Sequence, residues 1–278
     1  MLSRVRAPAR YRYTATVPTY RLTIEYDGTK FSGWQVQPRG RTVQGVLLEA
    51  LRDLTGETNL DLQGAGRTDA GVHALAQVAS LRCRRRLQPA ALLAALETTL
   101  PSDLAVRHLA PAAPSFHARH DATGRSYVYQ ISLRRSAFGK RVSWWVRPPL
   151  GLNRLAEALG RFCGRHDFRA FAKGGVAESP VVEVERCDLA VAADVVLLRF
   201  VASHFLWNQV RRMVGALVTV GRGEAEPEDV PRWLSGAAPP PPLAAPAAGL
   251  FLEAVRYPGE EFRLPPLAPL GIPAASAS

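Results

Sequence analysis

Hydrophobic positions along the chain recur with two different periods, which predict where strands and helices lie. Every second residue is apolar over 20–26 and again over 72–78, as in half-buried strands. Further strands are predicted over 60–62, 106–109, 125–133 and 250–257, and a hairpin over 182–200 that turns at Ala193-Asp194. Apolar stripes at helical spacing predict helices over 42–54, 92–100, 152–162, 206–217 and 227–234. Thr42 is placed to cap the first of these helices and Gly56 to end it.

Strand, helix and strand follow one another in the same order in two halves of the chain, without a repeat at the level of single residues. The fold class predicted is α+β, with two similar halves, each a mainly antiparallel sheet with helices on one face. We expect a flexible basic arm over 1–18, an N-terminal half over 19–112, a C-terminal half over 113–258 and a loose, proline-rich tail over 259–278. Residues 166–175 show no period and are predicted to form a mobile loop.

The loop at Gly64-Ala65-Gly66-Arg67-Thr68-Asp69-Ala70-Gly71 joins two predicted strands and holds one carboxylate, Asp69. Its glycines allow backbone conformations and close contacts that a Cβ would prevent. Arg67 lies two residues from Asp69, and its charge would favour the ionised acid, which can act as a base or a nucleophile. In the alternative reading, Asp69 only bonds backbone N–H groups of the turn and Arg67 is solvated.

Basic residues exceed acidic ones by 35 to 24, a formal net charge of +11. Such an excess points to a polyanionic partner, and no apolar run of about 18 residues is present to span a membrane. We therefore expect a nucleic acid as partner and no membrane. The three cysteines are widely spaced with no Cys-x-x-Cys pair, which favours a reducing compartment such as the cytoplasm and argues against a zinc site.

Other segments allow both a functional and a structural reading. The cluster Arg84, Arg85 and Arg86 would bind phosphates or form a solvated face. Residues 30–38 would contact bases and phosphates, or form a packed loop with Trp34 as its plug. His73 is expected to be a buried, hydrogen-bonded imidazole, and neither it nor His117 is assigned to catalysis. No spacing typical of a metal site is found.

Six motifs, taken together, resemble the TruA family of tRNA pseudouridine synthases over about residues 20–257. They are Tyr26-Asp27-Gly28 with Gly33-Trp34-Gln35, the Asp69 loop, Phe116-His117-Ala118-Arg119, Tyr127-x-Tyr129, Asn208-Gln209-Val210-Arg211-Arg212-Met213-Val214-Gly215 and Gly249-Leu250-Phe251-Leu252. The resemblance implies a central basic cleft where these motifs meet. It also implies isomerisation of uridine to pseudouridine at positions 38–40 of the tRNA anticodon stem-loop, by a homodimer that needs no metal or other cofactor.

The resemblance also implies roles for single residues. Asp69 would be the catalytic carboxylate, Arg211 its ion-pair partner, and Arg67 a group that displaces and positions RNA. Tyr127 would stack on an extruded uracil with its hydroxyl near C5. RNA would further be bound by Phe116, His117, Ala118, Arg119, Arg82, Arg84, Arg85, Arg86 and Lys173. Arg212 departs from the family pattern, in which an Asn is common, and this leaves the set of target uridines open.

Two other functions fit parts of the sequence. A non-catalytic tRNA-binding or chaperone protein on the same fold would keep the basic surface and would not need Asp69. A phosphate hydrolase with an aspartate nucleophile should carry a metal-binding acidic set, and the sequence shows none.

Overall fold

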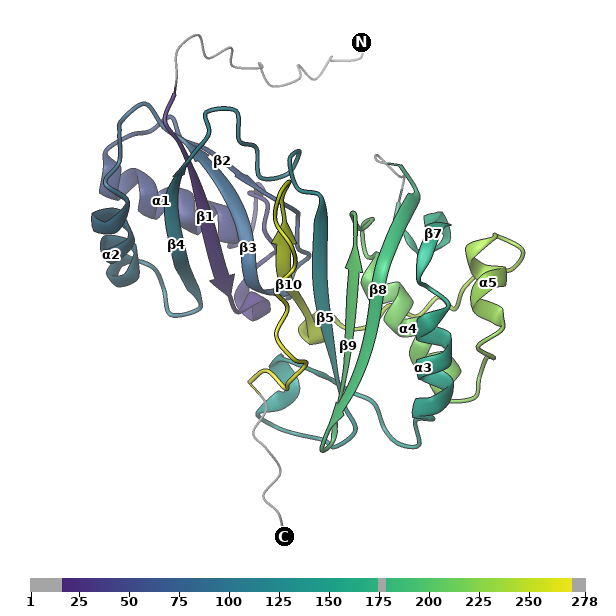
Figure 1. Ribbon diagram of the computed structural model, residues 1–278. Coiled ribbons are helices and arrows are strands. Elements are labelled where there is room, and N and C mark those ends of the chain that lie inside the picture. The colour runs from purple at the N-terminus through teal and green to yellow at the C-terminus, as the bar shows by residue number, and fades with distance from the viewer. Residues whose placement is uncertain (1–16, 175–178, 272–278) are drawn as a thin grey trace, which may run out of the picture.

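The computed structural model describes residues 17–174 and 179–271, and within them one ten-stranded sheet runs through the protein (Figure 1). The strand order is β4-β1-β3-β10-β5-β9-β8-β7, with β2 paired to β3 and β6 paired to β5. The strands are β1 (Thr19–Tyr26), β2 (Asp61–Gly64), β3 (His73–Arg82), β4 (Leu104–Ala112), β5 (Gly124–Ser132), β6 (Trp144–Trp145), β7 (Gly164–Asp167), β8 (Val181–Ala192), β9 (Val195–Ala202) and β10 (Leu250–Arg256). The helices are α1 (Val43–Thr55), α2 (Pro89–Thr99), α3 (Leu152–Gly160), α4 (Gln209–Gly221) and α5 (Asp229–Leu234).

Local sequence signals explain where the first helix begins and ends. The Thr42 side chain accepts a hydrogen bond from the backbone N–H of Gly45, as an N-cap does. Gly56 ends the helix in the left-handed conformation, with φ of +66°, where a side chain would be strained. These two boundaries were predicted, and the structure confirms them.

Helices α1, α3 and α4 pack on the same face of the sheet, and β10 lies between β3 and β5 in the strand order. Leu250 packs into the core beneath α3 and α4, whereas Leu252 packs into the core beneath α1. Because these residues are two apart on one strand, they point to the same face. β10 pairs with β5 along most of its length but with β3 at only two positions, Phe251↔His73 and Leu252↔Ala74. The predicted α+β class is confirmed, and a division of the chain at 112/113 stays a prediction.

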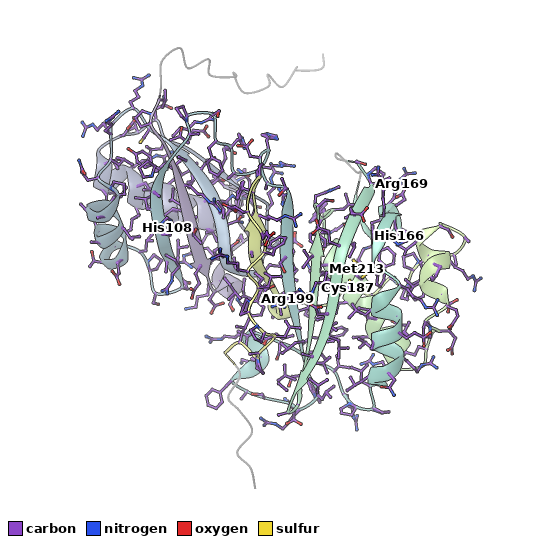
Figure 2. The ribbon with its side chains drawn as sticks, viewed as in Figure 1. His108, His166, Arg169, Cys187, Arg199 and Met213 are labelled. Atoms are coloured by element: carbon purple, nitrogen blue, oxygen red, sulfur yellow. The ribbon has the colours of Figure 1, made fainter. Side chains whose placement is uncertain are left out.

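The other face of the sheet is partly covered by the segment that follows β10. Gln130 is fully buried, and its side-chain amide exchanges two hydrogen bonds with the backbone of Leu270. Arg199, labelled near the middle of the sheet in Figure 2, donates to the carbonyl of Pro265. Leu267 packs on Val128 and its neighbours. The expectation of a loose tail is therefore wrong for residues 259–271, because the sheet supplies the partners that this segment lacks within itself. Residues 272–278 lie outside the described part of the chain.

The segment predicted to be a mobile loop is ordered over residues 166–174. His166 and Asp167 end β7, which pairs with β8, and a 3-10 turn follows at Arg169–Phe171 (Figure 2). Phe168 and Phe171 are fully buried in the C-terminal core. The prediction fails because these apolar residues lack any period but still fill the core.

The basic arm expected over 1–18 falls almost entirely outside the described residues, which begin at 17.

Candidate active site

The Asp69 loop connects β2 to β3, as predicted, and its backbone is fixed by residues 28–34. Trp34 donates its backbone N–H to the carbonyl of Thr68 at 3.1 Å, and Gly71 donates to the carbonyl of Phe31 at 3.2 Å. Gly71 has φ of +79°, which only glycine adopts without strain. Tyr26 shares a hydrogen bond of 2.8 Å with the Thr68 hydroxyl. The loop is thus held from both sides of the carboxylate.

Two glycines allow backbone to pack directly on backbone beneath this loop. A Cβ on Gly33 would lie 2.6 Å from the carbonyl oxygen of Thr68, and one on Gly28 would lie 2.0 Å from that of Val72. Trp34 is 1% exposed and fills the space beside them. Of the two readings for residues 30–38, the packed loop with Trp34 as its plug is therefore correct for Trp34. These residues pack beneath the Asp69 loop and support it.

The Asp69 side chain is 25% exposed, and two side chains contact its two oxygens. Arg211 Nη1 lies 3.3 Å from Oδ2, so the predicted ion pair is present. Trp207 donates its indole Nε1–H to Oδ1 at 2.9 Å. The guanidinium of Arg211 also donates to the carbonyl of Ala245 at 2.7 Å and to Oδ1 of Asn208 at 2.8 Å. The charged partner of Asp69 is therefore fixed by contacts other than Asp69 itself.

The turn before α4 aims these two side chains toward Asp69. Asn208 has φ of +64°, a left-handed conformation that asparagine tolerates better than most residues. Gln209 is polar and lies in the helix predicted over 206–217, yet it is fully buried, and its Oε1 accepts from the backbone N–H of Leu206. The buried amide satisfies a backbone donor near the helix start, and that requirement overrides the periodic pattern.

Tyr127 lies at the seam between the two cores and contacts both. Its ring meets Phe205 edge to face, with centroids 5.2 Å apart. Burial raises the pKa of Tyr127 to about 12, a rise that Arg125 opposes and the nearby Asp69 carboxylate increases. Among residues 17–174 and 179–271, no group forms a hydrogen bond with the Tyr127 hydroxyl. A protonated phenol with a free hydroxyl therefore lies within electrostatic range of Asp69.

Arg67 and Lys173 lie at the rim of the site. The side chain of Arg67 is exposed and forms no ion pair with Asp69 or any other described residue. Lys173 is exposed, and its ammonium lies 5.1 Å from the centre of the Trp207 ring, over its face. Both cations are thus placed to meet an incoming anion.

The Phe116-His117-Ala118-Arg119 motif contributes mainly to packing. Ala118 is fully buried and accepts a hydrogen bond from the Tyr257 hydroxyl, so its predicted contact with RNA is excluded in this structure. Phe116 packs on the Tyr257 ring, and the ring of His117 accepts from the backbone N–H of Arg119. Only the Arg119 side chain is exposed.

The structure does not bring Arg84, Arg85 and Arg86 near Asp69. They are exposed and follow the far end of β3, whose ten residues span roughly 30 Å. Glu57 accepts hydrogen bonds from the backbone N–H groups of Arg84 and Arg85. Any phosphate that this cluster binds must therefore lie a long way from the group at Asp69.

His73 is buried and hydrogen-bonded, as expected. Its Nδ1 accepts from the backbone N–H of Gly28, so Nε2 carries the proton toward the carbonyl of Arg141. Burial lowers the pKa of this imidazole, which favours its neutral form. Among the described residues, no three His, Cys, Asp or Glu side chains are grouped as a metal site would require, and no helix is long and apolar enough to cross a membrane.

Trp207 is the site residue that the sequence pattern did not reveal. It lies two residues before the start of α4, is 56% exposed and reaches a carboxylate 138 residues away in the chain. The sequence could have indicated Trp207 through its position between the apolar Leu206 and Arg211. A large aromatic residue at that point, off the apolar stripe of the helix, has no core to fill.

Comparison of the sequence with known proteins identifies a family. The chain matches the family model described as tRNA pseudouridine synthase over residues 22–121 and 158–258. It is 43% identical over 244 residues to tRNA pseudouridine synthase A of Pelobacter propionicus, covering 86% of this chain and 99% of that protein. It is 44% identical over 241 residues to the protein of the same name from Syntrophotalea carbinolica, covering 85% and 95% of the two chains. The chain therefore belongs to the tRNA pseudouridine synthase family.

Proposed function

We propose that this protein, a tRNA pseudouridine synthase and thus an isomerase, converts uridine to pseudouridine at positions 38–40 of the anticodon stem-loop, with Asp69 as its catalytic carboxylate. The observation that supports this role most directly is the Asp69 site itself. A partly exposed carboxylate on a rigid loop is held by Arg211 and Trp207 and lies within electrostatic range of Tyr127. These groups come from separate segments of the chain: the β2–β3 loop, the start of α4 and β5.

The reaction breaks the bond between N1 of uracil and C1′ of ribose and forms a bond from C5 to the same carbon. The C5 proton is released and N1 takes up a proton, so the product is an isomer of the substrate. An ionised carboxylate is the group this chemistry needs, as nucleophile or as base, and the Arg211 guanidinium lies 3.3 Å from Oδ2 of Asp69. Because the bond is out of reach inside a stem, the uridine must be extruded from its stack.

Tyr127 is suited to receive the extruded base. Stacking on an aromatic ring contributes about 1–3 kcal/mol per base, and the ring lies at the seam beside Asp69. Its raised pKa means that the hydroxyl is protonated at neutral pH. The hydroxyl therefore meets the uracil as a hydrogen-bond donor, and removal of the C5 proton requires it to pass its own proton on.

RNA binding is assigned to exposed cations on either side of the site. Arg67 and Lys173 would contact the nucleotides around the target, and Arg84, Arg85 and Arg86 would hold phosphates farther along the RNA. The net charge of +11 supports an electrostatic contribution, so binding should weaken steeply as salt rises. A homodimer in the cytoplasm is part of the proposal, and light scattering on the purified protein tests the dimer.

The decisive experiment compares the wild-type protein with Asp69→Asn on unmodified tRNA transcripts, with pseudouridine mapped chemically. We expect product at positions 38–40 with the wild type and a loss of at least about 1,000-fold with the variant. The variant should bind tRNA nearly as well, because the amide has almost the same shape.

The same experiment distinguishes the proposed synthase from the alternative, a non-catalytic tRNA-binding protein. A wild-type protein that binds tRNA but forms no pseudouridine would support the non-catalytic tRNA-binding protein instead. Full activity in Asp69→Asn would exclude the role given to Asp69. Product at other uridines would contradict the assignment to the anticodon stem-loop alone.

A further inference from the structure

The carboxylate of Asp69 is held by two donors of different kinds. Arg211 contacts Oδ2 with a charged guanidinium at 3.3 Å, and Trp207 contacts Oδ1 with a neutral N–H at 2.9 Å. A single donor leaves a carboxylate free to rotate about its Cβ–Cγ bond. Two donors, one on each oxygen, fix the plane of the carboxylate.

We propose that Trp207 is a positioning residue for the isomerisation, and that its indole N–H sets the orientation of the Asp69 carboxylate toward the ribose. This inference rests on the role proposed above for Asp69. A neutral donor is suited to this task because it orients the oxygen without placing a second cation beside it. A second cation would stabilise the free carboxylate further and so reduce its reactivity.

The structure holds Trp207 in place although more than half of its surface is exposed. Its carbonyl accepts from the backbone N–H of Lys173 at 2.9 Å, and the Lys173 ammonium lies over its ring. Gly174 has φ of +76°, which favours glycine, and a Cβ there would lie 3.3 Å from the same ring, a tight contact. Asn208, next to Trp207, has φ of +64°, and the indole N–H of Trp207 reaches the Asp69 loop. Contacts from two separate segments therefore aim a side chain that buries little apolar surface.

An indole at this place could also act by stacking on a base next to the target uridine. The two roles depend on different parts of the side chain: stacking needs the ring face, and positioning needs the N–H. Trp207→Phe keeps an aromatic face and removes the donor, whereas Trp207→His restores a ring N–H on a smaller ring. The pair of variants separates the two roles.

The kinetic test measures the single-turnover rate and the dissociation constant of tRNA for the wild type and both variants. We expect Trp207→Phe to lower the rate about 10-fold or more, because a hydrogen bond to a charged group is lost, with tRNA affinity unchanged within about twofold. Trp207→His should recover part of the rate. An unchanged rate in Trp207→Phe, or a loss that appears only in tRNA affinity, would overturn the proposal.

A spectroscopic test examines the contact without relying on activity. Labelling the five tryptophans with ¹⁵N gives one indole N–H signal for each, and the signal missing in Trp207→Phe identifies Trp207. In Asp69→Asn this signal should move more than the other four, because its acceptor loses its charge. If it does not move, the hydrogen bond is absent in solution and the proposal is wrong.

The two tests also distinguish this proposal from the one on which it rests. If Asp69→Asn retains full activity while the indole signal moves, the hydrogen bond exists but the reaction does not need the carboxylate. The catalytic role of Asp69 and the positioning role of Trp207 are then both refuted. If Asp69→Asn is inactive and Trp207→Phe is fully active, only the role of Trp207 is refuted.

Discussion

Two arginine–carboxylate pairs in this protein differ in how many hydrogen-bond donors the carboxylate has and in how far it is exposed. On one face of the sheet, Arg199 and Glu253 form a bidentate pair with distances of 2.8 and 2.6 Å, and their side chains are 3% and 5% exposed. Ser126 donates a further hydrogen bond to Glu253. At the candidate active site, Arg211 contacts only one oxygen of Asp69, and these side chains are 20% and 25% exposed.

The difference shows what separates a structural pair from a reactive one. The oxygens of Glu253 are surrounded by donors and protein, so no substrate can approach them. Asp69 has one charged donor and one neutral donor, and part of its surface stays open. Arg211 is instead bound to Ala245 and Asn208, which keeps the cation in place while the carboxylate is left partly free. The same two residue types thus serve stability in one place and chemistry in the other.

The largest effect expected from this comparison is on stability, at the buried pair. Arg199→Met should lower the free energy of unfolding by about 3–5 kcal/mol, because the carboxylate of Glu253 is left buried without its charged partner. Urea denaturation measures this change. The double variant Arg199→Met with Glu253→Leu should be more stable than the single variant, since the buried carboxylate is removed as well, while Asp188, 3.6 Å from Arg199, keeps its pair with Arg186. A single variant as stable as the wild type would show that the pair has no structural role.

Replacing the arginine of the candidate active site by methionine should lower the reaction rate more than the stability. Arg211→Met should reduce the single-turnover rate about 100-fold, because the Asp69 carboxylate loses the guanidinium that contacts its Oδ2 and helps to orient it. The free energy of unfolding should fall by about 1 kcal/mol, since both side chains are partly exposed. Rate and urea denaturation are measured on one preparation. Equal losses of stability in the Arg199 and Arg211 variants would remove the distinction drawn here.

Features that depend on nearby residues could be predicted from the sequence. The strands on either side of the Asp69 loop follow from their period of two, and the caps of α1 follow from Thr42 and Gly56. The pairing of Asp69 with Arg211 was expected from the family resemblance, and the geometry agrees. Strand periods and helix caps follow from the local sequence because they involve residues close together in the chain. The Asp69–Arg211 pair spans 142 residues and was expected only from the motifs of the family.

Features that depend on distant contacts could not be predicted. The segment 259–271 has few residues that favour a strand or helix, and its place follows from partners such as Gln130 and Arg199 on the sheet. Phe168 and Phe171 were predicted to lie in a loop because their spacing matches neither a helix nor a strand, although both are buried in the core. Trp207 contacts Asp69 across 138 residues of sequence. In each case, the deciding partner lies on another segment of the fold.

The smallest effect is expected at a third pair, which is intermediate in geometry. Arg41 and Asp103 form two hydrogen bonds of 2.7 Å, with side chains 35% and 20% exposed. Hydrogen bonds from Arg41 hold the pKa of Asp103 below its usual value, so the pair stabilises the fold above the unfolded pKa of about 3.9, and this contribution is lost as pH falls through the lower folded pKa. Asp103→Asn should therefore cost about 1 kcal/mol at pH 7 and much less at pH 3, as measured by urea denaturation at both pH values. An equal cost at both would mean that the charge of Asp103 is not what stabilises the protein, and that a bidentate pair in this partly exposed position contributes through its packing alone.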